Sequence, residues 1–253
     1  MTDPPLASNA SVMNAITYDT KFFEARAAEV AVARTILEVV FQYIRPSSIV
    51  DLGTGAGSWL AAAKQLGVAC VKGVDGNWVP EEQRHLSPTE FVPANFETAL
   101  PDLGRFDLAI CTEVLEHISA PASVRAVEWL CRSAPVVLFS AAIPDQGGTH
   151  HINEAWQSHW AALFKQNGYE TFDLIRPKIW SDARLPWWYR QNILLMANAE
   201  ASTRLGLSAG AMTLDLVHPD LYLNHTGHIR RLQERARKGF VKALLKRFRS
   251  VPG

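Results

Sequence analysis

Apolar runs and helical patterns alternate along most of this chain. Short apolar runs predict strands over residues 48–52, 69–75, 90–94, 106–111, 135–141 and 170–174, and a last strand from Tyr189 to Ala197. Apolar positions three and four residues apart predict helices over residues 21–43, 58–66, 79–85, 121–132 and 155–166. Such alternation is typical of an α/β fold, in which a doubly wound, mostly parallel sheet carries helices on both faces.

In such a sheet, ligands bind beyond the carboxyl ends of the strands. The loops expected at that edge begin at Asp51, Asp75, Ala94, Thr112 and Ser140. We therefore expect these five loops to converge on one cleft.

A glycine-rich loop joins the first predicted strand to the helix that follows it. Gly53, Gly55 and Gly57 alternate with small residues, and glycine lets the backbone turn tightly against a ligand. The next strand ends in Asp75, 18 residues after Gly57, close to the spacing of roughly 20 expected of an acid that holds ribose hydroxyls. The glycine-rich loop and Asp75 together predict a nucleotide-binding unit.

Two details of this unit distinguish between cofactors. The Gly-x-Gly-x-Gly spacing, with Ser58 next, departs from the Gly-x-Gly-x-x-Gly loop that binds a pyrophosphate. Asp51 precedes the first glycine, where a carboxylate would repel a pyrophosphate but would attract an ammonium group. S-adenosylmethionine has an ammonium group, a sulfonium and no phosphate, so we expect it in preference to NAD or FAD. A turn that only packs the helix on the strand is the structural alternative.

Composition restricts the class of protein further. The 253 residues are 48% hydrophobic with no formal net charge, as expected for one globular catalytic domain with appendages. The body before residue 228 is acidic, which argues against a nucleic-acid partner and favours a small-molecule substrate. No signal sequence or membrane span is recognised, so a cytoplasmic location is expected. Cys70, Cys111 and Cys131 are scattered and are expected to be reduced packing residues.

The C-terminal tail concentrates positive charge. From residue 228 onward there are nine Lys or Arg and one acid, Glu234. Apolar residues recur at helical spacing among them: Ile229, Leu232, Ala236, Phe240, Leu244 and Phe248. This pattern predicts an amphipathic basic helix, with a break at Gly239. Three interpretations are open: docking onto an anionic membrane surface, docking onto the acidic body of a second subunit in a homodimer, and packing on its own domain with the basic face in solvent.

Several of these motifs occur together in one known family. They are residues 18–23, 50–55, 73–76, 106–108, 113–117 and 139–144. The series resembles the class I S-adenosylmethionine-dependent methyltransferases. Residues 147–154 resemble the Gly-Gly-x-x-His-x-Asn-Glu segment of a bacterial subgroup, which tends to have Gly where this chain has His150.

The resemblance implies a seven-stranded sheet in the order 3-2-1-4-5-7-6 with the last strand antiparallel. On this basis we expect three parts: residues 1–45 as an N-terminal segment and lid helix, residues 46–198 as the S-adenosylmethionine-binding catalytic domain, and residues 199–253 as a helical C-terminal extension.

The resemblance also implies a binding role for particular residues. Asp51 and the loop glycines Gly53, Gly55 and Gly57 would face the methionine end of the cofactor. Asp75, followed by Gly76, would accept both ribose hydroxyls. Asn95 would contact the adenine edge with Trp78 or Phe96 beside the ring, unless these aromatic side chains pack in the core. Thr112 and Glu113 would border the same cleft.

Catalytic residues depend on the acceptor. A hydroxyl acceptor must lose a proton, and histidine is the usual base at neutral pH. His150 and His151 lie on the loop over the predicted cleft, with Asn153 and Glu154 near enough in sequence to orient an imidazole. Both histidines could instead support the loop. Tyr18 belongs to a segment that forms a lid over the cofactor in relatives.

Residues 113–117 also resemble a segment that holds a divalent metal in ubiquinone-pathway O-methyltransferases. Glu113, Glu116 and His117 could offer ligands to Mg²⁺. The same residues occur in metal-free relatives, and we assign no metal.

The sequence therefore predicts methyl transfer from S-adenosylmethionine to a small metabolite, on oxygen in preference to nitrogen, in small-molecule biosynthesis. Two other classes stay open. A cyclase or lyase would consume S-adenosylmethionine and release methylthioadenosine without an acceptor. A non-catalytic partner protein would bind the cofactor without turnover.

Overall fold

The computed structural model describes residues 20–208 and 212–249, and their side chains over residues 28–208 and 212–238. The helices are α1 (Thr20–Val40), α2 (Ser58–Gln65), α3 (Ala120–Ser133), α4 (Gln157–Gln166), α5 (Arg176–Ile179), α6 (Trp187–Asn192), α7 (Ala199–Arg204) and α8 (Pro219–Arg249), with 3₁₀ turns η1 (Glu81–Gln83) and η2 (Leu115–His117). The strands are β1 (Ser48–Leu52), β2 (Cys70–Asp75), β3 (Phe91–Pro93), β4 (Leu108–Thr112), β5 (Val136–Ser140), β6 (Tyr169–Phe172) and β7 (Leu194–Asn198).

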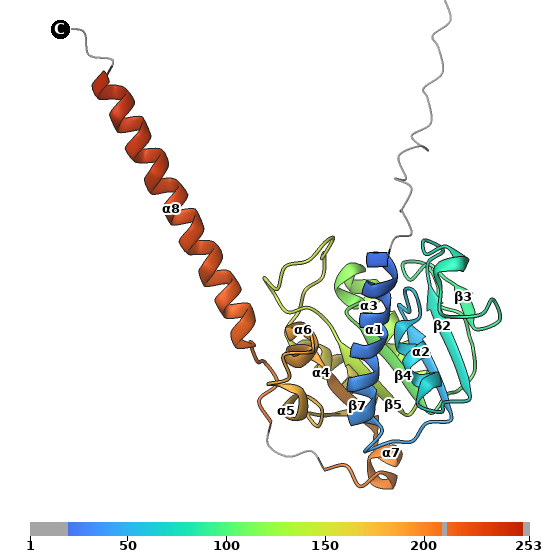
Figure 1. The fold of residues 1–253 in the computed structure, drawn as a ribbon. Coiled ribbons are helices and arrows are strands. Elements are labelled where there is room, and N and C mark those ends of the chain that lie inside the picture. The colour runs from blue at the N-terminus through green and yellow to red at the C-terminus, as the bar shows by residue number, and fades with distance from the viewer. Residues whose placement is uncertain (1–19, 209–211, 250–253) are drawn as a thin grey trace, which may run out of the picture.

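The strands form one seven-stranded sheet in the order β3-β2-β1-β4-β5-β7-β6 (Figure 1). The first five are parallel to their neighbours, and β7 runs antiparallel to both β5 and β6. The predicted fold class, strand order and antiparallel strand are confirmed. The central strands β4 and β5 are fully buried, which is why they read as continuous apolar runs rather than alternating ones.

Two hydrophobic layers cover the two faces of the sheet. One contains apolar side chains of α1, α2 and α5, and the other contains those of α3 and α4. Along β1, Ile49 joins the first layer while Val50 and Leu52 join the second. Because side chains alternate along a strand, Asp51 faces the same side as Ile49. An acidic side chain is therefore placed beneath the layer formed by α1 and α2.

The prediction of a last strand from Tyr189 to Ala197 is wrong over its first half. Residues 187–192 form helix α6, and only residues 194–198 form β7. Pro186 lies at the N-cap of α6 with an extended ψ of 136°, and proline's fixed φ suits the start of a helix. The apolar and aromatic content of this segment favours a strand, but the chain turns here before it enters the sheet.

Three smaller expectations are also corrected. The helix predicted over residues 79–85 is only the 3₁₀ turn Glu81–Gln83, after which Arg84 returns to an extended conformation. The tail helix begins at Pro219 rather than at Ile229 and continues through Gly239 to Arg249. Cys70 is exposed, whereas Cys111 is buried as expected.

Candidate active site

Two neighbouring cavities open at the carboxyl edge of the sheet and share Gly53. The β2 cavity, of about 380 Å³, is lined among others by Gly53, Asp75, Trp78, Asn95, Phe96 and Glu113. The α1 cavity, of about 400 Å³, is lined among others by Glu29, Gly53, Gly55, Trp59, Thr112 and Tyr189. Each is within the size range of small-molecule sites. Four of the five strand ends predicted to converge, those of β1 to β4, contribute to these two cavities, whereas no residue of the loop after Ser140 lines either of them.

The glycine loop between β1 and α2 needs its glycines. The backbone φ angles of Gly53, Gly55 and Gly57 are 80°, 54° and 87°. Residues with a Cβ rarely adopt such positive values. A Cβ on Gly53 would lie 2.3 Å from the Val114 side chain, and one on Gly57 would lie 2.7 Å from Leu86. A Cβ on Gly55 would meet nothing within 4 Å. Gly55 therefore leaves free space at the wall of the α1 cavity.

Asp75 ends β2 and is fixed by the backbone around it. Its Oδ2 accepts a hydrogen bond from the Gly55 N–H at 2.6 Å, and its Oδ1 accepts one from the Gly76 N–H at 2.7 Å. Burial raises the pKa of Asp75, while hydrogen bonds from Gly55, Gly76 and the Trp78 side chain lower it. The carboxylate thus ties the glycine loop to the end of β2 and borders the β2 cavity.

Trp78, Asn95 and Phe96 line the β2 cavity in different ways. The Trp78 indole is 65% exposed and lies directly against Gly76, where a Cβ would come within 1.9 Å of the ring. Phe96 is buried in the core layer of α3 while also lining the cavity. Asn95 is exposed, and its Oδ1 accepts a hydrogen bond from the Glu97 N–H at 3.0 Å. Its amide nitrogen has no hydrogen bond in this structure to another described residue.

Asp51 lies beneath the glycine loop and lines neither cavity. It is 1% exposed, and its Oδ2 has no hydrogen-bond partner among the described residues. Burial raises the pKa of Asp51 to about 7, and the negative charge of Asp75 adds to this effect. A buried carboxylate oxygen without a donor is costly. A cation or donor brought in by a ligand would relieve that cost.

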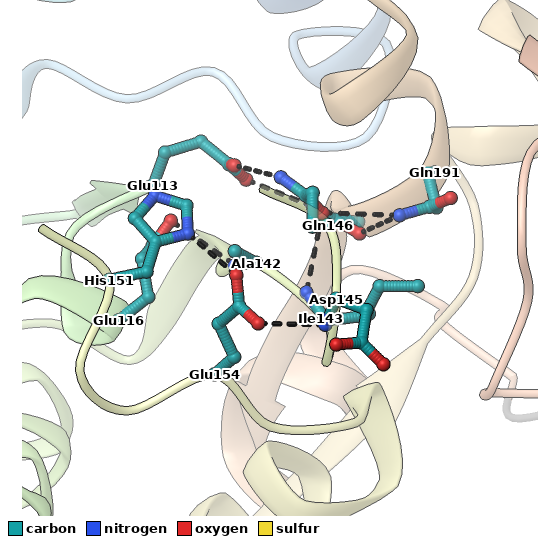
Figure 2. Close-up of polar contacts among 10 residues, drawn as sticks. Glu113, Glu116, Ala142, Ile143, Asp145, Gln146, His151, Glu154 and Gln191 are labelled. Carbon is teal, nitrogen blue, oxygen red and sulfur yellow. Dashed lines mark hydrogen bonds and ion pairs between the residues drawn. The ribbon is translucent and has the colours of Figure 1, made fainter. Parts of the chain in front are cut away.

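Glu113, directly after β4, anchors a network of buried amides (Figure 2). Its backbone φ is 54°, a strained value for a residue with a side chain. Its carboxylate accepts hydrogen bonds from Gln146 Nε2 at 3.0 Å and Asn192 Nδ2 at 3.2 Å. Asn192 Nδ2 and Gln191 Nε2 also donate to Gln146 Oε1, at 2.8 and 3.2 Å. Burial raises the pKa of Glu113, and hydrogen bonds, with that from Ser140 first, offset part of the rise.

The sequence did not reveal this network. Asn192 and Gln191 lie in α6, which the pattern predicts as a strand, and Gln146 lies in the loop after β5. The one available signal is the position of Gln146, a polar residue directly before the Gly147-Gly148 pair.

Glu116 joins η2 to the loop after β5. It is fully buried; its Oε1 accepts from the Ala142 N–H at 3.2 Å, and its backbone oxygen accepts from the N–H groups of Ile152 and Asn153 at 2.8 and 3.1 Å. Burial raises the pKa of Glu116 to about 9, and the charge of Glu113 contributes. Its carboxyl group therefore holds a proton at neutral pH.

The two candidate histidines differ sharply. His151 is 13% exposed, and its Nδ1 lies 2.8 Å from Glu154 Oε1 (Figure 2). The other oxygen of Glu154 accepts from the Asp145 N–H at 2.8 Å, so the carboxylate is itself fixed. His150 is exposed with a φ of 60°. The structure therefore orients His151 and leaves His150 at the surface.

His117 connects this pair to the β2 cavity. Its ring lies edge-on to the His151 ring, with centroids 4.7 Å apart, and it lines the cavity. Partial burial lowers the pKa of His117, and the neighbouring His151 lowers it further. Ligand atoms of Glu116, His117 and His151 lie within 4.8 Å of one another. This group differs from the set Glu113, Glu116 and His117 considered from sequence, because Glu113 turns toward the amides.

Tyr18 falls outside the described residues, so its role in a lid stays a prediction; α1, the helix that follows it, lines the α1 cavity with Glu29 and Val32 among others.

The comparisons with known proteins agree on one family. The model of a family described as "Methyltransferase domain" matches residues 23–192. No curated protein sequence matches the chain. The sugar N-methyltransferase KedS8 from Streptoalloteichus sp. is similar over 78% of this chain and 99% of its own, with a TM-score of 0.51 and 16% identity.

Two further solved structures are similar. A candidate O-methyltransferase from Nostoc punctiforme is similar over 70% of this chain, which spans 58% of the length of that protein, with a TM-score of 0.50 and 13% identity. A candidate methyltransferase from Haloferax volcanii, solved in complex with the activator Trm112, is similar over 70% of this chain and 94% of its own, with a TM-score of 0.50 and 14% identity. These likenesses show a shared fold. Since the family match covers more than half of the sequence, including the loops that line both cavities, the chain belongs to the methyltransferase-domain family.

Proposed function

We propose that this protein transfers a methyl group from S-adenosylmethionine to a hydroxyl oxygen of a small metabolite. The observation that carries the proposal is the presence of two neighbouring cavities that share Gly53 in their lining, one bordered by Asp75 and the other by Gly55, where a Cβ would meet nothing within 4 Å. An adenosine and an amino-acid chain would each need one of these spaces. The oriented imidazole of His151 adds the base that a hydroxyl acceptor requires.

The residues present fit S-adenosylmethionine. Asp75 presents a fixed carboxylate to the β2 cavity, where a ribose diol would donate to it. The unpaired Oδ2 of Asp51 beneath the glycine loop is suited to the cationic end of the ligand. S-adenosylmethionine supplies a methyl group that its own sulfonium charge activates. The protein's main task is then to position the acceptor in line with that group.

His151 is proposed as the general base. The Glu154 carboxylate accepts the proton on Nδ1, so the lone pair of the neutral ring lies on Nε2. A carboxylate held in this way also stabilises the imidazolium that forms when Nε2 takes the acceptor proton. His117 contacts the His151 ring and lines the β2 cavity, and its lowered pKa favours the neutral imidazole. Of the predicted pair His150 and His151, only His151 has the contacts of a base.

The acceptor is proposed to be polar. Glu113 lines the β2 cavity, and behind it the buried side chains of Gln146 and Asn192 add two carboxamides to its carboxylate. Such groups bind hydroxyls and amides better than apolar surface, because their hydrogen bonds can be exchanged with those of a ligand. The proposed base favours oxygen over nitrogen as the acceptor. A hydroxyl must lose its proton to a base before it attacks, whereas a neutral amine needs less such help, so an oriented base is more useful for a hydroxyl.

The test measures products. Purified protein would be incubated with S-adenosylmethionine and a panel of hydroxylated metabolites, and S-adenosylhomocysteine would be quantified by mass spectrometry. Acceptor-dependent S-adenosylhomocysteine supports the proposal. Methylthioadenosine without any acceptor would instead favour the cyclase or lyase class. Tight binding without turnover on any acceptor would favour a non-catalytic partner.

In the described part of the chain, no helix is both long and apolar enough to cross a membrane. The cytoplasmic location and the three-part division at residues 45 and 198 stay predictions.

A further inference from the structure

Helix α8 stands away from the rest of the protein (Figure 1). Its first turn is firmly attached: Leu221 is buried, and Arg190 Nη2 of α6 lies 2.6 Å from Asp220 Oδ2. Just before the helix, the His218 N–H donates to Gln191 Oε1 at 2.8 Å. From residue 228 to residue 238, all side chains are exposed. Over these described side chains, the helix therefore does not pack on its own domain, contrary to that interpretation.

The exposed part of α8 carries large apolar side chains. Tyr222, Leu223, Ile229 and Leu232 are 63%, 60%, 52% and 48% exposed. Tyr222, Ile229 and Leu232 are separated by seven and three residues, so they lie on one face of the helix. In the sequence, the spacing continues at Ala236, Phe240 and Leu244. Tyr222, Ile229 and Leu232 thus form an apolar stripe on a projecting helix, which indicates an interaction surface.

Positive charge accompanies this stripe. Between Pro219 and Arg249 the sequence has nine Lys or Arg and two acids, Asp220 and Glu234. At about 1.5 Å of rise per residue, the 31-residue helix is about 46 Å long. All nine basic residues fall between Arg230 and Arg249, in the part of the helix farther from its attachment to the domain, as expected for contact with an extended anionic surface.

We propose that α8 lies on the surface of a membrane that contains anionic lipids. Its apolar stripe would enter the boundary between headgroups and acyl chains, and its basic residues would contact lipid phosphates. Two copies of α8 would repel each other because both are strongly basic. The acidic body of a second copy would attract the basic residues, and the oligomeric state of the variants below tests that occupant. Nucleic acid would satisfy the charge but would leave the apolar stripe in water. An anionic bilayer surface satisfies both features.

The attachment of α8 gives docking a consequence for the cleft. Asp220 pairs with Arg190 of α6, and the same helix contributes Trp188 and Tyr189 to the α1 cavity. A protein held through α8 would therefore present its cavities at a fixed orientation to the bilayer. This inference does not depend on the acceptor or on the chemistry proposed above.

The test is co-sedimentation of the full chain with vesicles of phosphatidylcholine, with or without phosphatidylglycerol. We expect binding only to the anionic vesicles, and release at high salt. The variant Arg230→Gln/Arg231→Gln should bind more weakly, by about 5-fold for each basic residue removed. The matched control Arg132→Gln/Arg204→Gln removes two exposed charges from the body and should bind like the wild type.

A second variant tests the apolar stripe. Ile229→Ser/Leu232→Ser should reduce vesicle binding, while Asn224→Ser/His228→Ser, on exposed polar positions of the same helix, should not. Circular dichroism would check that the helix persists in each. Absence of binding, or equal binding to neutral and anionic vesicles, would overturn the proposal. A wild-type dimer that Ile229→Ser/Leu232→Ser converts to a monomer, without vesicle binding, would assign the stripe to a second copy.

Discussion

His151 Nδ1 and Glu154 Oε1 lie 2.8 Å apart, on a loop whose Ile152 and Asn153 N–H groups donate to the backbone oxygen of Glu116 in η2, shortly after β4. The imidazole is thus oriented by its own loop, and the loop is held by the sheet. This relationship separates an oriented base from the neighbouring, exposed His150.

Replacing His151 should therefore impair chemistry more than binding. We expect His151→Ala to lower kcat by about 10²- to 10⁴-fold, the usual contribution of a general base, with little change in the Kd of S-adenosylmethionine. Glu154→Gln should lower kcat less and alter the pH profile of kcat, because the ring loses its fixed orientation. The control His150→Asn keeps a residue that tolerates the positive φ and should retain activity. Equal losses in His150→Asn and His151→Ala would contradict the assignment.

Asp51 should make the ligand-free protein less stable as pH rises. Its pKa is about 7 in the folded state against an ordinary value of 3.8. Between these two pH values the folded protein binds more protons than the unfolded chain, so the free energy of unfolding falls as pH rises across that window. Above pH 7 the loss amounts to about 4 kcal/mol. Asp51→Asn removes the ionisable group and should therefore raise the free energy of unfolding by much of this amount at pH 8. At pH 5 the gain should be only about a third as large. Urea denaturation at both pH values would measure the two gains.

The same substitution should weaken binding of S-adenosylmethionine, measured by calorimetry. Asp102→Asn, at an exposed carboxylate, is the control and should change neither quantity. A variant that is more stable at pH 8 and binds the cofactor normally would remove Asp51 from the binding site.

Asp75 should control affinity for the nucleoside. Asp75→Ala removes the acceptor of the Gly55 and Gly76 N–H groups as well as the proposed ribose contact. We expect affinity for S-adenosylhomocysteine to fall by at least about 10-fold, the effect of one hydrogen bond to a charged group. Asp102→Asn again serves as control in calorimetry. Unchanged affinity would show that the nucleoside binds elsewhere.

The amide network should contribute to folding. Asn192→Leu leaves the buried Glu113 carboxylate with one donor fewer and should cost about 1–3 kcal/mol of unfolding free energy. Asn224→Leu, at an exposed site on α8, is the matched control. Thermal and urea unfolding would measure both. An unaffected Asn192→Leu would show that Gln146 alone suffices to hold Glu113.

Chelation of divalent cations should leave turnover unchanged. With a pKa of about 9, Glu116 is uncharged at neutral pH, and His151 is already bonded to Glu154. Activity would be compared before and after dialysis against EDTA. Loss of activity that Mg²⁺ restores would assign Glu116, His117 and His151 to a cation instead.

The sheet could be predicted because its strands are short, apolar and separated by recognisable turns. The error at α6 arose where aromatic residues mimic a strand although Pro186 starts a helix. The loop glycines and Asp75 could be predicted because a tight turn after a strand requires glycine at positive φ, and because the acid follows at a recognisable spacing at the end of the next strand. The partners of Glu113 could not, since Gln146 and Asn192 meet it only through the folded arrangement of three separate segments.

The position of Trp78 bears on which nucleosides the cleft would accept. Its side chain already donates a hydrogen bond to Asp75 while lying against Gly76. A ribose with two free hydroxyls would replace the single Trp78 donor to the Asp75 carboxylate by two donors. A 2′-deoxy sugar, with one hydroxyl, would only exchange one donor for another. In the ligand-free protein, the Trp78 side chain thus competes with a sugar for the Asp75 carboxylate. This exchange of donors would favour ribose over deoxyribose, and no further group that excludes the deoxy sugar would be needed.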